Sequence, residues 1–246
     1  MKGIRLRHLV TVGPRPTQSR TLIGDVEVTF APMDALADGL GGLDTSQTRT
    51  FSEVSAGSYN YFEDGDILIA KVTPCFENGK KALAHGLTNG MGFATSEVHV
   101  IRTDGHRIHP RYLLYILCSE DFRAAGMASM TGAGGLRRVS EAAILNYRPH
   151  ITDVAAQKEI ADFLDFETAR INDIIDQIGG QITARAAEPG TFLSLLYEKR
   201  SSLITAAVTG QIDVSTWPKR GAIDQPHDEI KQRSAALSSE KVEARR

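Results

Sequence analysis

The sequence predicts an α+β protein that ends in long helices. Up to about residue 152, the sequence contains short β-branched segments and an apolar helix that starts at a proline, a mixture typical of α+β domains. Beyond residue 152, apolar residues recur at intervals of three and four, the period of helices packed along a seam. We therefore expect a globular domain over 1–152, antiparallel or coiled-coil helices over 153–214, and a disordered polar tail over 215–246.

Three segments define secondary structure in the first part. The turn Asp64-Gly65-Asp66 precedes an apolar run that predicts a buried strand over Ile67–Val72. Ser96–Arg102 alternates and is β-branched, which predicts a second strand. Pro110 opens an apolar helix that we expect to end just before Gly126, because proline suits the first helical turn and glycine the position after the last.

The second part is predicted to form two helices. Thr152 or Asp153 supplies the first N-cap, and the seam that follows consists of Ala161, Leu164, Thr168, Ile171, Ile175, Ile178 and Ile182. Breaks at Gly179-Gly180 and Pro189-Gly190 separate it from a second helix whose apolar side carries Phe192, Leu193, Leu196, Tyr197, Leu203 and Ile204. A lone amphipathic helix is marginal in water, so the seam needs either this second helix or another chain.

Composition predicts a soluble cytoplasmic protein. The 41% hydrophobic and 24% charged residues are ordinary for a globular chain of 246 residues. Cys75 and Cys118 stand apart from each other and from any histidine cluster, which predicts reduced thiols rather than a disulfide or zinc site. Charges interrupt the N-terminal segment before a signal peptide can form, and the longest apolar run, "YLLYILC", is too short to cross a membrane.

Charge is unevenly distributed although the net charge is only −2. Lys and Arg outnumber Asp and Glu by 5 to 2 over residues 1–30 and by 10 to 6 over 71–150. The balance reverses to 1 against 7 over 31–70 and 2 against 7 over 151–182. A chain with this pattern can present one basic face to nucleic acid despite its neutral total.

Motifs for catalysis are missing from the sequence. It has no Asn/Asp-Pro-Pro-Tyr/Phe loop for an adenine methyltransferase, and its one Glu-x-Lys, at Glu229 and Lys231, falls in the polar tail rather than beside another metal-binding carboxylate. "GAGGLRR" lacks the full pattern of a dinucleotide or phosphate loop. His106 and His109 have no further ligands nearby to hold a metal. We expect no catalytic centre and no metal site.

Two linked motifs resemble the helical spacer of the specificity subunits of type I restriction-modification systems. The first consists of Gln157, Ile160, Ala161 and Leu164, and the second of Arg200, Leu203, Ile204, Ala207, Val208, Thr209 and Gly210. The segments "GDILIAKVTPCFENGKKALA", "GFATSEVHVIR" and "HPRYLLYILCSEDF" look like a target recognition domain of that family. With one recognition domain and one spacer, the chain is similar to a half-length form.

The resemblance implies a non-catalytic subunit that directs adenine methylation and restriction to a bipartite DNA target. Its expected partners are double-stranded DNA and modification subunits, with a restriction subunit left open and no membrane. S-adenosylmethionine, ATP and Mg would belong to those partner subunits, with no cofactor in this chain. Pairing of two identical chains predicts an inverted-repeat target, whereas pairing with another specificity chain gives two different halves.

Candidate residues follow from the chemistry of DNA reading and from the spacer pattern. Arg, Lys and Asn are common readers of base edges, and phosphate contacts set the register. The DNA-binding candidates are Lys71, Thr73, Asn78, Lys80, Lys81, Arg137 and Arg138, together with Ser96 and Glu97, which the resemblance adds because the family pattern recurs at that strand start. The candidates for a spacer, dimer or partner interface are Leu164, Ile171, Ile175, Ile178, Ile182, Leu196, Arg200, Leu203 and Ile204.

Two alternatives remain open from the sequence. The chain could be a truncated regulator that occupies modification subunits but reads no site, or a silent cassette that exchanges its recognition domain with a full-length subunit. Neighbouring genes discriminate between them: modification and restriction genes favour an active subunit, and a full-length specificity gene with inverted homology favours the cassette.

Overall fold

The computed structural model describes residues 3–17, 25–40, 42–133, 135–183 and 190–217. Residues 1–212 pack as one compact unit, and a second unit starts at Asp213. Every helix and strand among the described residues belongs to the first unit. The tail predicted from residue 215 onward lies outside the described residues after Trp217.

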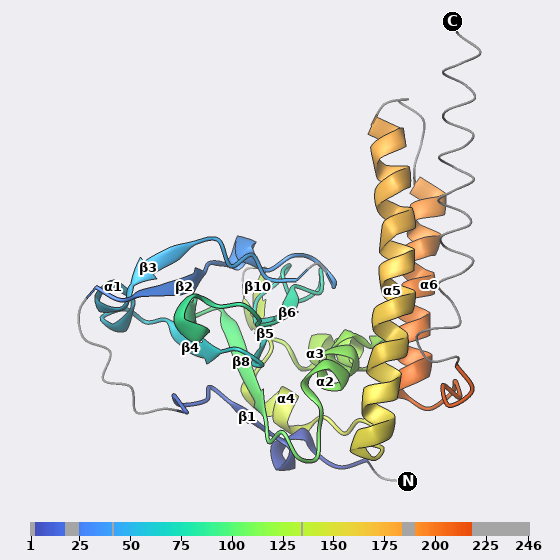
Figure 1. Cartoon of the computed structure of the whole chain (residues 1–246), viewed down its shortest axis with the longest axis horizontal. Coiled ribbons are helices and arrows are strands. Elements are labelled where there is room, and N and C mark those ends of the chain that lie inside the picture. Colours follow the sequence, from blue (N-terminus) through green and yellow to red (C-terminus); the bar gives the residue numbers. More distant parts are fainter. Residues whose placement is uncertain (1–2, 18–24, 41, 134, 184–189, 218–246) are drawn as a thin grey trace, which may run out of the picture. The chain divides into compact units, whose positions relative to one another are not determined.

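The first sheet has four antiparallel strands and includes part of the basic segment 71–150 (Figure 1). Its strands, in spatial order, are β1 (Val10–Val12), β8 (Val98–Thr103), β5 (Ile67–Ala70) and β6 (Lys81–Leu83). Strands β5 and β8 confirm the two predicted strands. Strand β8 begins two residues later than predicted because the Val98 amide donates to the Thr95 carbonyl, which closes a turn over Ser96 and Glu97.

A second four-stranded sheet lies against the first. It consists of β3 (Thr48–Thr50), β2 (Glu27–Ala31), β7 (Met91–Ala94) and β4 (Asn60–Glu63), with β2 and β7 parallel and the other pairs antiparallel. Helix α1 (Phe51–Ser55) follows β3 through a capping box in which Thr50 and Glu53 each bond the other's backbone amide. Two 3-10 turns, Met33–Ala35 and Thr88–Gly90, follow β2 and precede β7.

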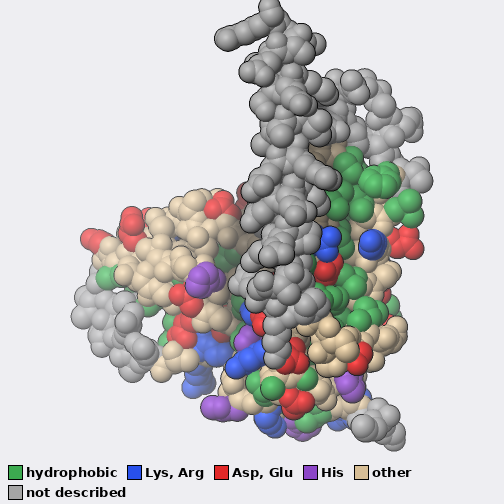
Figure 2. Space-filling model, turned by 45° about the vertical axis from the view of Figure 1, so that its right-hand side comes forward, with side chains coloured by type: hydrophobic (Ala, Val, Ile, Leu, Met, Phe, Trp, Pro, Cys, Tyr) green, Lys and Arg blue, Asp and Glu red, His purple; other side chains and the backbone are tan. Residues whose placement is uncertain are grey.

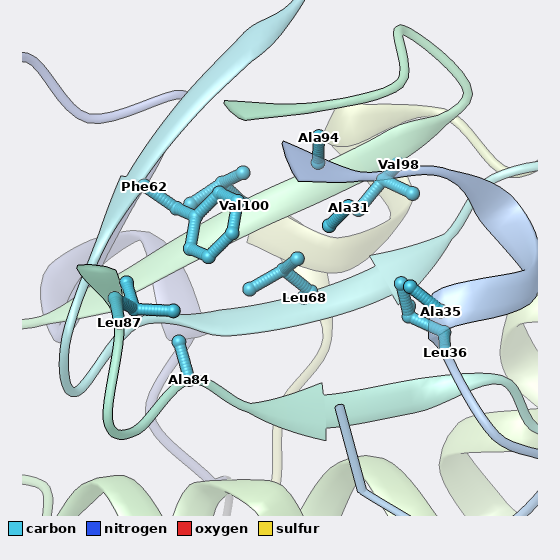
Figure 3. Packing of buried hydrophobic residues seen from close by; sticks show 10 residues of the cluster. All are labelled: Ala31, Ala35, Leu36, Phe62, Leu68, Ala84, Leu87, Ala94, Val98 and Val100. Carbon is cyan, nitrogen blue, oxygen red and sulfur yellow. The ribbon is translucent and has the colours of Figure 1, made fainter. Parts of the chain in front are cut away.

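The main core fills the space between these sheets. Figure 3 shows its ten residues, which are Ala31, Ala35, Leu36, Phe62, Leu68, Ala84, Leu87, Ala94, Val98 and Val100. Alternation along β2 sends Ala31 into this core and Phe30 to the opposite face, where Val54 of α1 packs. The sheets therefore form a rigid platform for the segments at their edges.

The helix predicted from Pro110 to Gly126 is two helices, α2 (Pro110–Cys118) and α3 (Glu120–Ser129). Ser119 separates them in extended conformation and caps α3, its Oγ accepting the Phe122 amide. The predicted end at Gly126 is also wrong, because this glycine lies within α3. A Cβ there would come within 2.3 Å of the Phe76 ring, so glycine allows close packing. Two shorter elements, Leu6–His8 (3-10) and α4 (Glu141–Asn146), complete this side.

Helices α5 (Val154–Thr183) and α6 (Gly190–Val208) pack side by side and run in opposite directions (Figure 1). Asp153 caps α5, with its Oδ1 2.9 Å from the Ala156 amide nitrogen, as predicted. The predicted break at Gly179-Gly180 is wrong, since α5 continues to Thr183. Each glycine costs only about 1 kcal/mol relative to alanine, which a long packed helix tolerates.

The predicted seam of α5 is buried within the chain. Exposure rises along it from 0% at Ala161 and Leu164 to 6% at Ile171 and 9% at Ile175. The predicted apolar side of α6 is only partly right: Ile204 is buried, but Phe192 and Tyr197 are 56% and 47% exposed. Helix α6 buries its C-terminal residues against α2 and α5, because α2 and α3 contact that half of the helix.

Candidate nucleic-acid interface

An exposed β-hairpin is attached to the segment that follows β5, an inner strand of the first sheet. Strand β9 (Thr131–Ala133) pairs with β10 (Leu136–Arg138), with Arg138 opposite Thr131, and all six residues are exposed. Gly132 has φ +139°, and a Cβ there would lie 2.3 Å from the Leu136 carbonyl oxygen, so the ribbon requires glycine at this position. The glycine-rich sequence therefore builds a hairpin rather than a phosphate loop.

Backbone hydrogen bonds fix this hairpin to the segment after β5. The Thr73 amide donates to the Arg137 carbonyl at 3.0 Å, and the Val139 amide donates to the Lys71 carbonyl at 2.9 Å. The Thr73 Oγ accepts the Arg137 amide at 3.0 Å and donates to the Gly135 carbonyl at 2.9 Å. Thr73 thus holds both the turn and the second strand of the hairpin in place.

A buried histidine anchors the end of β10. The His99 Nε2 lies 3.0 Å from the Val139 carbonyl, and the side chain is 8% exposed. Burial lowers the pKa of His99 to about 4, so the ring is neutral near pH 7 and its Nε2–H donates to that carbonyl. Sequence reasoning missed this residue; its position in the alternating strand "SEVHVIR" was the one available signal.

Charged side chains surround the base of the hairpin. The Arg138 Nε and Nη2 each lie 3.0 Å from a different Glu97 carboxylate oxygen, a bidentate pair that lowers the pKa of Glu97. The Lys71 Nζ donates to the Ser96 carbonyl at 2.7 Å, and burial lowers the pKa of Lys71. The Arg137 Nη2 donates to the Met127 carbonyl at 3.0 Å.

This arrangement offers both donors and acceptors on an exposed ribbon. Arginine has five N–H donors, and Arg138 uses only two nitrogens on Glu97, so donors remain for a ligand. A two-stranded ribbon fits the major groove of DNA, where arginine reads guanine and a carboxylate can accept from cytosine. Leu136 is 48% exposed beside the arginines, and an apolar side chain of this kind can contact a thymine methyl group.

Six of the nine predicted DNA-binding residues lie together at this place, namely Lys71, Thr73, Ser96, Glu97, Arg137 and Arg138. The structure does not bring the other three into that group. Asn78 is exposed on the turn that follows Pro74, and Lys80 donates to the Leu36 carbonyl at 2.5 Å. Lys81 is only 8% exposed, on β6, which packs against α2.

The predicted interface residues of the helices differ in how deeply their side chains are buried. Leu164, Ile171, Ile175 and Ile204 are buried in the chain itself, while Ile178, Leu196, Arg200 and Leu203 are half-buried. The side chain of Ile182 lies outside the described residues. The intramolecular helix pair, one of the two partners that the sequence left open, therefore covers the inner part of the seam.

Gln157 joins α5 to the globular part, a role that only the structure reveals. Its side chain is 0% exposed; the Oε1 accepts the His109 amide at 2.8 Å, and the Nε2 donates to the Arg107 and Thr152 carbonyls at 2.9 and 2.8 Å. Arg111 adds ion pairs to Asp162 and Asp165 of α5. The sequence motif that contains Gln157 thus marks a junction.

The described residues contain no group of three or more His, Cys, Asp or Glu side chains placed to hold a metal ion. A cavity of about 720 Å³ lies between α1, β4 and β7, with Phe51, Tyr61, Met91 and Phe93 in its wall. The carboxylate of Glu63 at its edge accepts bonds from Thr17 and Tyr61. No helix among the described residues is long and apolar enough to span a membrane.

No protein-family model matches the chain. It is 33% identical over 144 residues to the Escherichia coli "Type I restriction enzyme EcoEI specificity subunit", and 41% identical over 113 residues to the EcoAI specificity subunit of the same organism. The chain is similar to type I restriction specificity subunits. The sequence resemblance is thereby confirmed.

The likeness to these specificity subunits covers parts of both chains. The EcoEI match spans 58% of this chain and 24% of the relative, and the EcoAI match spans 46% and 19%. The chain thus matches less than a quarter of the length of these relatives. The HsdS subunit from Thermoanaerobacter tengcongensis shares the fold, with a TM-score of 0.57 and 15% identity over 73% of this chain and 44% of that one. The α+β class is confirmed.

Proposed function

We propose that the chain is a DNA-reading specificity subunit of a type I restriction-modification complex, with the β9–β10 hairpin as its base-contacting element. The observation that carries this proposal is the 41% identity to a specificity subunit. The exposed hairpin, with its arginines and its carboxylate, supplies side chains suited to reading base edges. The chain itself is non-catalytic and works in the cytoplasm.

Chemistry in such a complex comes from partner subunits. Modification subunits would bring S-adenosylmethionine, and ATP and Mg would belong with a restriction subunit. Helices α5 and α6 are the proposed assembly surface. Ile174, Phe192, Leu195 and Tyr197 are 43–56% exposed, and Figure 2 shows hydrophobic side chains gathered on the helical pair. Pairing of two identical chains would give an inverted-repeat DNA target.

The test is base-resolution mapping of adenine methylation in the native host and in a strain that lacks only this gene. Loss of a gapped inverted repeat in the deletion strain supports a symmetric pair, whereas loss of a motif with different halves supports pairing with another specificity chain. If no motif changes, the DNA-reading role is refuted. A truncated regulator or a silent cassette then takes its place.

Complementation with variants tests the hairpin separately. Arg138→Ala removes an exposed arginine paired with Glu97, and Arg123→Ala removes one paired with Glu120 on α3; their side chains are 47% and 44% exposed. We expect Arg138→Ala to reduce or relax methylation, since a lost bidentate base contact costs about 1–3 kcal/mol. Arg123→Ala should restore the wild-type pattern. Equal patterns from both variants would exclude Arg138 as a reader.

A further inference from the structure

Aromatic side chains line the outer face of the second sheet. The ring centroids of Tyr61 on β4 and Phe93 on β7 are 5.4 Å apart at 73°, and that of Phe51 in α1 lies 5.9 Å from Phe93 at 64°. These are edge-to-face rather than stacked contacts, which leave ring faces available to a further group. The cavity of about 720 Å³ between α1, β4 and β7 has all three rings in its wall, and its volume is typical of a ligand site.

The same face already holds one guanidinium group. The Arg49 guanidinium, on β3, lies 3.8 Å from the centroid of the Phe30 ring, and its Nη1 donates to the Tyr59 hydroxyl at 3.3 Å. Phe30 belongs to the same apolar cluster as Phe93. A cation over a ring is attracted by the negative charge of the ring face. An aromatic ring and a hydrogen-bond acceptor on this face therefore suffice to hold an arginine side chain.

The cavity has acceptors but no cation in its wall. Glu63 and Asp64 line it, whereas no lysine, arginine or histidine does so among the described residues. Arg102 lies 3.1 Å from a Glu63 oxygen, yet it also forms a bidentate pair with Asp66, so one guanidinium serves two carboxylates. The Asp64 Oδ1 accepts the Leu87 amide at 3.2 Å, and Asp64 forms no ion pair with any described residue. Negative charge is thus in excess at the cavity.

Glu63 keeps its negative charge at neutral pH. Its carboxylate accepts the Thr17 amide and hydroxyl at 2.8 and 2.7 Å and the Tyr61 hydroxyl at 2.6 Å. Burial alone would raise the pKa of Glu63, but these hydrogen bonds and the charge of Arg102 lower it. Carboxylates at the cavity repel the phosphates of DNA and attract a cation.

We propose that this cavity is a binding site for a guanidinium group, which stacks on the aromatic rings and donates to the carboxylates of Asp64 and Glu63. A guanidinium is planar, carries five N–H donors and stacks on aromatic faces, so it uses both kinds of group in the wall. Its source is either an arginine side chain of a partner protein or a free guanidinium compound. No residue of the β9–β10 hairpin lines the cavity, so the site is separate from the proposed DNA-reading surface.

The first test is a titration of the isotope-labelled full chain with N-acetyl-arginine amide, followed by amide chemical shifts. We expect saturable shifts at residues of the cavity wall, Ser55 and Gly90 among them. N-acetyl-citrulline amide has the same shape without the charge and should bind at least about fivefold more weakly. Absence of saturable shifts with the arginine derivative, or equal binding of both compounds, overturns the site. Saturable shifts with adenosine in place of the arginine derivative overturn it too, and assign the cavity to a nucleobase.

Substitutions with a matched control locate the site. Asp64→Asn removes one charge and keeps the oxygen that accepts the Leu87 amide, and Asp34→Asn makes the same change at an exposed residue outside the cavity. We expect Asp64→Asn to weaken binding of N-acetyl-arginine amide about threefold, and Asp34→Asn to stay within about 1.5-fold of wild type. Phe51→Leu keeps an apolar wall without the ring and should also weaken binding about threefold. If Phe51→Leu does not fold, the exposed Asp64 decides; equal affinities of the two Asp→Asn variants overturn the site.

Two further ligands identify the source of the guanidinium group. A capped Ala-Ala-Arg-Ala-Ala peptide presents it on a polypeptide, and agmatine presents it on a free small molecule. Tighter binding of the peptide supports an arginine of a partner protein, and tighter binding of agmatine supports a free compound. None of these measurements involves DNA, so their outcome is independent of the proposed function.

Discussion

Replacement of Gln157 by leucine tests the junction between α5 and the globular part. The substitution keeps the volume of the side chain but leaves the His109 amide and the Arg107 and Thr152 carbonyls without their partner. A buried polar group left unsatisfied costs about 1–3 kcal/mol. Three such groups, partly rehydrated, predict a loss of about 3–5 kcal/mol in the free energy of unfolding.

The assay is urea unfolding of the full chain, read from the midpoint at constant slope. Gln177→Leu is the matched control, because it makes the same chemical change at an exposed position of the same helix. We expect this control to change the free energy of unfolding by less than about 0.5 kcal/mol. If Gln157→Leu is no more destabilising than Gln177→Leu, the three hydrogen bonds do not secure the junction.

Two further predictions concern the sheets. Folding lowers the pKa of His99 from 6.5 to about 4. Between these two pH values the unfolded chain binds more protons than the folded chain. The contribution of His99 to the free energy of unfolding is therefore complete above pH 6.5 and is lost as the pH falls toward 4. Between pH 6.5 and 5 the wild type should lose about 2 kcal/mol more than His99→Gln in urea unfolding, and parallel curves for the two proteins would contradict this. Gly92→Ala should destabilise by about 1–3 kcal/mol in the same assay, since its Cβ would lie 2.3 Å from the buried Phe62 ring; an unchanged midpoint would mean that the ring relaxes freely.

Local patterns were sufficient to predict strands β5 and β8 and the two long helices α5 and α6. A turn followed by an apolar run located β5, alternation located β8, and the three-four repeat located the buried seam of α5. Where prediction failed, packing between distant segments had decided. Ser119 became a cap between two helices, and Gly126 lies within α3 because Phe76 packs against it. A sequence pattern contains no information on such a contact across fifty residues.

The candidate site shows the same division. Residue type and a position on loops beside strands selected Lys71 and Arg138, and the family pattern selected Glu97; the structure brings the three together around the hairpin. The same reasoning selected Lys80 and Lys81, although Lys80 bonds the Leu36 carbonyl and Lys81 is buried on β6, which packs against α2. Exposure and partners depend on strand register and on the neighbouring helix, which the chemistry of a lysine does not specify.

The sequence by itself determined the α+β class, the start of helix α5 after Asp153 and the likeness to specificity subunits, because periodicity, capping and motif spacing are properties of neighbouring residues. Only the tertiary structure decided that the seam of α5 is covered by α6, that the glycine-rich segment is a β-hairpin, and that Gln157 hydrogen-bonds α5 to the globular part. These features need residues far apart in the chain to meet. The pairing of sheets and helices, rather than any local preference, sets which residues do so.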